Sequence, residues 1–290
     1  MDFKSMEELL DLCEREKKSI AEVMLDLECS KSGQTQEKII DQMKQRLIKM
    51  KEAIDEGVSD KSQAPSGISG GDAYLMERYR EKGEYLSGDI ISDAMRFAFA
   101  TSEMNARMGV IVATPTAGSA GILPGCLFSL YENKNFNFEH LVMGLFTASA
   151  IGYVIANRSF ISGAAGGCQA EVGSATAMAA AAIVEIKQGT PHQAIHACAI
   201  ALKSMLGLVC DPVAGLVEVP CIKRNVIGTA IAFAAADIAL AGIESRVPCD
   251  EVIGAMYDIG KSMPRALRET ALGGPAITPT GQEIKKRIMK

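Results

Sequence analysis

The feature that most constrains this fold is a long stretch of sequence with almost no charge. Residues 108–184 contain five charged residues among 77, whereas residues 1–61 contain 11 lysines and arginines and 15 aspartates and glutamates. A segment with so few charges belongs in a protein interior, because ionised side chains are costly to bury. We therefore expect two units, an acidic amphipathic helical region over residues 1–61 and a larger unit with an apolar core over residues 62–290.

Hydrophobic periodicity indicates an all-α, mostly helical fold. Little of the chain alternates with period two, as a half-exposed strand does. Only 5% of the residues are aromatic and 27 are glycine, which is typical of closely packed Gly/Ala-rich helices joined by glycine-rich loops. The uncharged stretch 141–157 is interrupted by Gly144 and Gly152 and is short for a bilayer span, so we expect a buried helix there and no membrane anchor.

The acidic N-terminal region has the pattern of a helical hairpin. Ser5 and Glu8 have the spacing of a capping box at a helix start. Residues 30–33 separate the first helical part from a helix predicted over residues 36–56, whose apolar positions recur at steps of three and four. These positions are Ile40, Met43, Leu47, Met50 and Ile54. The stripe suits packing against the rest of the chain or a partner interface, and we favour packing.

Charge and the start of the chain limit its partners and its compartment. The net charge of −5 leaves no chain-wide basic footprint for nucleic acid. Residues 1–8 lack the apolar core of a signal peptide, which indicates a cytoplasmic protein. In that reducing compartment the eight cysteines are expected to be metal ligands, nucleophiles or core side chains and not disulfides.

Three glycine-rich segments interrupt predicted helices and are the candidates for a site. In the first, residues 114–125, the hydroxyls of Thr116 and Ser119 stand among glycines that include Gly118 and Gly121. Glycine lets successive backbone N–H groups face an anion. Because the segment lacks both the Walker lysine and the dinucleotide fingerprint, a small carboxylate suits it better than a nucleotide. A plain turn between helices is the alternative.

The other two segments carry cysteines. Cys168 follows glycines and precedes an alanine-rich helix, whose dipole favours the thiolate form. Cys210 and Cys221 flank a loop that its prolines and Gly215 keep from being one continuous helix, so both sulfurs can face a common point. Without a C-x-x-C pair, spacing alone leaves both a metal centre and buried, redox-silent thiols open.

Two further cysteines and a pair of histidines look structural, whereas the sequence leaves the role of Cys249 open. Cys198 lies in the middle of an apolar helix, and Cys126 opens an apolar segment. His192 and His196 have the i, i+4 spacing of metal ligands, but the residues between them lack the glutamate of a zinc-protease motif. Thr190 followed by proline is a good helix start just before this pair.

The three segments together resemble the alpha chain of iron–sulfur-dependent L-serine dehydratase of the two-chain type. The matching elements are residues 66–72, 114–125, 163–175, 208–225 and 273–281. They span most of the chain from residue 66 onward, and the long element that holds Cys210 and Cys221 is the most specific. The resemblance implies a mostly helical catalytic domain that holds a [4Fe–4S] cluster.

The resemblance also implies the ligands and the chemistry. Cys168, Cys210 and Cys221 would ligate three irons, and the fourth iron would meet the substrate as a Lewis acid for the leaving hydroxyl of L-serine. The resulting aminoacrylate becomes an imine and hydrolyses to pyruvate and ammonia. Single-chain relatives end in a cysteine that can occupy the fourth iron, but the last cysteine here is Cys249. Water, substrate or a partner residue then fills that position.

Further site residues are hypotheses from the chemistry of the three segments. Thr116, Gly118, Ser119 and Gly121 are expected to bind the substrate carboxylate. Arg224 adds a charge-assisted hydrogen bond to that carboxylate, with a structural ion pair as the alternative, and Asn225 orients a ligand. Glu171 and Asp211 adjoin the cluster cysteines as acid/base candidates or as supporting groups, and helix capping is favoured for Asp211.

No proton-abstracting base stands out in this chain, and the resemblance implies a separate beta chain whose serine- and histidine-containing motif completes the site. L-serine and this beta chain are the expected partners. Two other classes stay open. One is a pyridoxal-phosphate enzyme, for which Lys203 is the one lysine well inside the apolar region. The other is a non-catalytic iron–sulfur or zinc scaffold, or an electron carrier.

Overall fold

The computed structural model describes residues 2–134 and 136–289, and their regular structure is helical throughout, as predicted. The α-helices are α1 (Met6–Glu16), α2 (Ile20–Ser32), α3 (Gln36–Ser59), α4 (Asp72–Glu81), α5 (Gly88–Ala106), α6 (Ile122–Lys134), α7 (Phe138–Arg158), α8 (Gly163–Gly166), α9 (Ser174–Ile186), α10 (Pro191–Met205), α11 (Cys221–Leu240), α12 (Cys249–Ser262) and α13 (Pro279–Ile288). The short elements are the 3₁₀ turns η1 (Ala117–Ser119), η3 (Val213–Gly215), η4 (Arg265–Leu267) and η5 (Gly274–Ile277), and the π-helical turn η2 (Gln169–Gly173).

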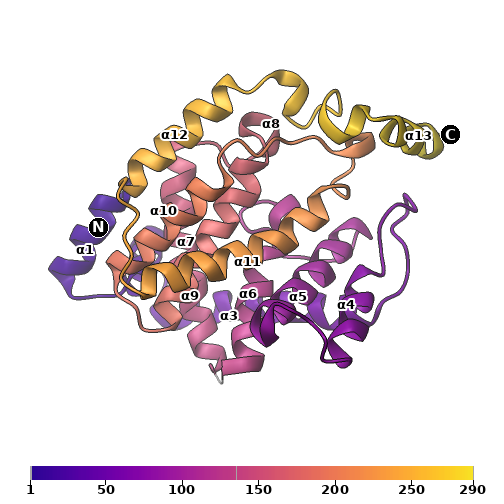
Figure 1. Ribbon diagram of the computed structural model, residues 1–290. Helices are drawn as coiled ribbons and strands as arrows, with labels where there is room; N and C mark the ends of the chain where they lie inside the picture. The colour runs from indigo at the N-terminus through magenta and orange to yellow at the C-terminus, as the bar shows by residue number, and fades with distance from the viewer. Residues whose placement is uncertain (1, 135, 290) are drawn as a thin grey trace.

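Helix α9 is the centre of the fold. Of its 13 residues 12 are buried, and half of these are alanine. It packs against α6, α7, α10 and α11, which surround it in Figure 1. Small side chains allow neighbouring helix axes to come close, so the alanine run explains how so many helices can share one central helix.

The N-terminal helices pack onto this body. A left-handed backbone at Lys17 (φ 53°) ends α1, so the part before Gly33 is two helices and not one. Helices α2 and α3 then form the predicted hairpin, and they contact α7 and α5. The apolar stripe of α3 joins the common core, with Leu47, Met50 and Ile54 fully buried and Ile40 and Met43 partly buried. The preferred interpretation, packing against the chain itself, is confirmed.

Helix α7 is the predicted buried helix. Its length and composition alone would allow it to cross a membrane, but 61% of its most apolar window is buried inside the protein. It packs against α2 on one side and α9 on the other. Helix α7 is therefore a helix of the protein core.

Carboxylates from distant parts of the chain cap three helix starts. Glu185 accepts the N–H of Ile20 at the start of α2 (2.7 Å), Asp250 accepts two N–H groups of α1, and Glu103 accepts two of α4. The first N–H groups of a helix have no partner within it and favour negative charge. These contacts tie the outer helices to the core. Helix α10 begins at Pro191 with Thr190 as its N-cap, as predicted.

Candidate metal centre and active site

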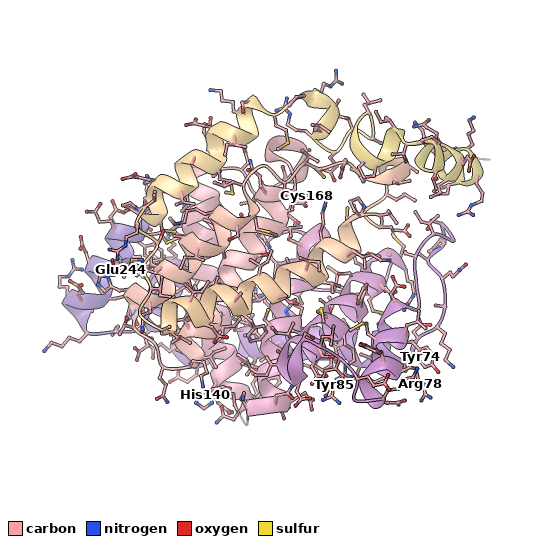
Figure 2. The ribbon with its side chains drawn as sticks, in the orientation of Figure 1. Tyr74, Arg78, Tyr85, His140, Cys168 and Glu244 are labelled. Atoms are coloured by element: carbon pink, nitrogen blue, oxygen red, sulfur yellow. The ribbon has the colours of Figure 1, made fainter. Side chains whose placement is uncertain are left out.

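The three cysteines predicted as ligands lie close together in a buried place. Cys168 immediately precedes η2, a π-helical turn that runs directly into α9, and such turns often mark functional sites. Cys210 lies in an extended stretch that forms an isolated bridge with Arg268, and Cys221 is the first residue of α11. Their side chains are 1%, 2% and 6% exposed. In Figure 2, Cys168 lies near α8, at the opposite side of the molecule from His140.

The pKa values of the three thiols shift in opposite directions. The thiols of Cys210 and Cys221 hydrogen-bond to the sulfur of Cys168, and these bonds, with the nearby Arg224 guanidinium, lower the pKa of Cys168 to about 3. The same contacts, with burial, raise the pKa of Cys210 and Cys221. Soft sulfur donors grouped in this way are ligands that iron and zinc take.

Arg224 lies beside the sulfurs and is held by an acidic partner. Its Nη1 donates to the Sγ of Cys168 (3.4 Å), to the carbonyl oxygen of Val209 (2.7 Å) and to the Oδ1 of Asp211 (2.8 Å). Asp211 is buried, and Gly274, with φ 56°, packs so tightly on its carboxylate that a Cβ would not fit there. A substrate carboxylate that reached Arg224 would have to share the guanidinium with Asp211. The structure thus contains the ion pair that was the alternative role for Arg224.

Glu171 connects the sulfurs to the hydroxyl-bearing loop. Its carboxylate and the sulfurs of Cys168 and Cys210 lie within 4.8 Å of one another. Thr116 Oγ1 donates to Glu171 Oε1 at 2.6 Å. Burial raises the pKa of Glu171 to about 7. This carboxyl group is therefore positioned to hold a proton next to the sulfurs.

The loop before α6 is fixed against α11 by Asn225. The side-chain amide of Asn225 donates to the carbonyl of Gly118 (2.7 Å) and accepts the N–H of Gly121 (3.0 Å). Thr116 and Ser119 hydroxyl oxygens lie 3.1 Å apart. Of the four residues predicted to bind a carboxylate, Thr116 and Gly118 are half-buried, whereas Ser119 and Gly121 are fully enclosed.

The other cysteines are apart from this group. Cys198 on α10 faces Cys249 at the start of α12, with their sulfurs 3.4 Å apart. Cys126 is completely buried, as expected. Lys203, the candidate for a pyridoxal-phosphate enzyme, donates from its ammonium to the carbonyl of Ser245.

The three histidines make structural contacts. His192 Nε2 lies 2.8 Å from a carboxylate oxygen of Glu14, and His196 accepts the N–H of Ser245. His140 caps the start of α7 through Asn137. The prediction that His192 and His196 are structural agrees with these contacts.

The sequence analysis missed two features of the site. A Cβ at Gly163 in α8 would lie 2.7 Å from both the Cys210 sulfur and a Glu171 oxygen, so this glycine makes the space in which they meet. Glu218, between the second and third cysteines, accepts hydroxyl groups from Ser66 and Ser69. In the sequence, Glu218 stands out as the one charged residue among the apolar residues 212–220.

The fold and the site together define a class of protein. Its chain is helical, and three thiols, a carboxyl group and a guanidinium lie together at the end of the central helix α9. The family model described as serine dehydratase alpha chain matches residues 15–276. The probable L-serine dehydratase alpha chain of Bacillus subtilis is 54% identical over 286 residues, which cover 99% of this chain and 95% of that protein. The L-serine dehydratase alpha chain of Peptoniphilus asaccharolyticus is 44% identical over 283 residues, which cover 98% and 97%.

A longer protein, the L-serine dehydratase of Helicobacter pylori, is 36% identical over 289 residues, which cover 96% of this chain and 62% of that protein. The matched regions include all three glycine-rich segments and all three site cysteines. The chain belongs to the serine dehydratase alpha chain family, which confirms the resemblance seen in the sequence.

Proposed function

We propose that this chain is the cluster-bearing chain of an L-serine dehydratase, which eliminates water from L-serine and releases pyruvate and ammonia. The observation that carries the proposal is the meeting of Cys168, Cys210 and Cys221, which come from three separate segments, in one buried group. The names of the relatives support the substrate and the reaction. The eight free cysteines suit a reducing compartment, the cytoplasm.

The donor set fits a [4Fe–4S] cluster held by Cys168, Cys210 and Cys221. Thiolates are the usual ligands of such clusters, and hydrogen bonds to the sulfurs tune them. Arg224 provides a donor of this kind to Cys168, and Gly163 leaves the space beside Cys210 that any side chain would fill. With three protein thiolates, a bound cluster supplies one iron that is open to act as a Lewis acid toward the substrate hydroxyl and carboxylate.

The loop before α6 is the proposed carboxylate site. Thr116 and Gly118 are half-buried and are positioned to contact the substrate carboxylate directly. Ser119 and Gly121 are enclosed and already hydrogen-bonded, so their part is to hold the loop in shape. Asn225 fixes this loop to α11, which also carries Cys221, and so sets the distance between the carboxylate site and the sulfurs.

Glu171 is the proposed acid for the leaving group. One of its oxygens accepts from Thr116, and the other lies beside Gly163 and Cys210. A proton held on that second oxygen would pass to the departing hydroxyl group, which leaves as water. Asp211 has a different part, because it is buried and paired with Arg224, and it holds that guanidinium against the Cys168 sulfur.

A beta chain is the proposed partner and the source of the base that removes the α-proton. The three histidines of this chain are occupied by Glu14, Ser245 and Asn137. The chain covers at least 95% of the two relatives named alpha chain but 62% of the longer relative. We therefore propose that a second polypeptide provides the remaining part of the enzyme.

Anaerobic purification of the chain, with iron and acid-labile sulfide analysis, tests the proposal. We expect about four irons and four sulfides per chain, the stoichiometry of a [4Fe–4S] cluster. Addition of L-serine is expected to perturb the cluster spectrum, and pyruvate is expected to form only when the beta chain is present. An absence of acid-labile sulfide would contradict the proposed cluster. Full turnover by this chain alone would contradict the proposed need for a beta chain.

A further inference from the structure

The segment of residues 66–72 contacts a distant part of the chain through two serine side chains. Ser66 Oγ donates to Glu218 Oε2 at 2.7 Å, and Ser69 Oγ donates to the same oxygen. Ser69 is 7% exposed and Glu218 is 6% exposed. The contact therefore joins two parts of the chain about 150 residues apart in a place that excludes most water.

The carboxylate of Glu218 depends on these two hydroxyls. Burial of a carboxylate is costly unless it is paired or hydrogen-bonded. The ion pairs among the described residues do not include Glu218, and the neighbouring basic residues Lys223 and Arg224 pair with Asp72 and Asp211. Removal of both serine hydroxyls would therefore leave a buried charge without its donors, which costs more than the bonds alone contribute.

Glu218 also controls the start of α11. Its carbonyl oxygen accepts the N–H of Ile222 at 3.0 Å, which is the first backbone bond of the helix that begins with Cys221. Within the same loop the N–H of Val213 bonds to the carbonyl of Val219 at 2.8 Å. The position of Glu218 thus determines where the Cys221 sulfur lies relative to the rest of the loop.

The serine segment is itself held in place by backbone contacts. Ala64 N–H bonds to the Ser69 carbonyl at 2.8 Å, and Gly70 has φ 121°, where a Cβ would overlap the carbonyl of Ser62. The following residue pair is anchored as well, because Glu103 of α5 accepts the N–H of Asp72. The segment, which lies between α3 and α4, is thus hydrogen-bonded both within itself and to α5.

We propose that Ser66, Ser69 and Glu218 form a latch that holds the loop between Cys210 and Cys221 in the position required for cluster binding. Glu218 is a positioning residue, since it acts through the loop and not on the substrate. The inference rests on the proposed function in that it takes these two cysteines as cluster ligands.

The first test measures how long the anaerobically reconstituted cluster survives a chelator. Loss of a hydrogen bond to a buried charge costs enough free energy to change an equilibrium constant about tenfold or more. We therefore expect two variants, Glu218→Ala and the double variant Ser66→Ala with Ser69→Ala, to lose iron at least about tenfold faster than the unchanged chain. Glu218→Gln keeps an acceptor and should restore part of the retention. The variant with all three alanine changes should lose iron only slightly faster than Glu218→Ala or the double serine variant, because the three residues act as one unit.

Glu185→Ala is the matched control, because Glu185 is another partly buried carboxylate that accepts a threonine hydroxyl and backbone N–H groups. Its rate of iron loss should stay within about twofold of the unchanged chain, since it does not contact the ligand loop. Equal acceleration in this control, or rates within about twofold for Glu218→Ala and the double serine variant, would overturn the latch.

Hydrogen exchange in the metal-free chain separates the latch from the proposed function. If the unchanged chain takes up no cluster, the proposed function fails, but the latch still predicts that the amides of Ala64 and Val213 exchange about tenfold faster in Glu218→Ala. Should Glu218→Ala not fold, the double serine variant gives the same comparison. Unchanged exchange at both amides would overturn the latch.

Discussion

The helix formed by η2 and α9 carries a glutamate near each end, and the two glutamates differ only in their partners. Both are partly buried, burial raises the pKa of each, and each accepts a threonine hydroxyl. Glu185 also accepts the N–H groups of Ile20 and Ala21 and so caps α2. Glu171 instead faces the sulfurs of Cys168 and Cys210.

This difference shows that burial and a raised pKa do not by themselves identify a site. A carboxylate that accepts helix N–H groups has its hydrogen-bonding capacity satisfied by the fold, and its role is structural. A carboxyl group that faces the sulfur atoms of a candidate metal site keeps an oxygen for chemistry. The partners of the second oxygen distinguish Glu171 from Glu185.

The largest expected effect comes from the sulfurs at the Glu171 end. Cys168→Ser, Cys210→Ser and Cys221→Ser should each lose the cluster and reduce pyruvate formation by more than about a hundredfold, since ligands matter more than their supporting residues. Cys198→Ser should keep the cluster, because its sulfur faces Cys249. Iron and sulfide analysis beside the activity assay checks this. Equal cluster loss in all four variants would mean that the cysteines were sorted wrongly.

The comparison of the two glutamates gives the next largest effect. Glu171→Gln removes the proposed acid and should lower kcat by about 10²- to 10⁴-fold, the usual contribution of a general acid. Its iron content should stay unchanged. Glu185→Gln should keep kcat within about twofold. A similar fall in both variants, measured with the beta chain present, would show that Glu171 acts through stability alone.

The threonine partners offer a smaller and more selective change. Thr116→Val removes a half-buried hydroxyl from the proposed carboxylate site and should lower kcat/KM for L-serine by about tenfold, the value of one hydrogen bond. Thr147→Val, its counterpart beside Glu185, should leave kcat/KM unchanged. If only the Thr147 variant lost activity, the catalytic end of the η2–α9 helix would be the Glu185 end and not the Glu171 end.

The smallest effect concerns the pH dependence of stability. Burial raises the pKa of Glu185 above its usual value of 4.5. Its protonated form is therefore favoured by folding, and its contribution to stability decreases as the pH rises from 4.5 through the raised value. Glu185→Gln should flatten this decrease in urea unfolding experiments between about pH 4 and pH 7. A steeper decrease in the variant would contradict the sign of the shift.

Local patterns were enough for much of this architecture. The all-α fold, the α2–α3 hairpin and the start of α10 at Thr190 follow from periodicity and capping. Cys168, Cys210 and Cys221 were separated from Cys198 because they stand in turn-rich segments. The contacts of Glu218 with Ser66 and Ser69 were not predicted, since they join residues about 150 positions apart.

By itself, the sequence determined that the chain is helical, where several helices begin and which thiols stand in turn-rich segments, because capping, glycine conformation and hydrophobic period act over a few residues. Only the tertiary structure decided that Arg224 pairs with Asp211, that Glu185 caps a helix while Glu171 faces sulfur, and that a serine segment holds the ligand loop. The reason is physical. Distances between residues far apart in the chain are set by how the helices pack around α9. Local sequence patterns do not predict these distances.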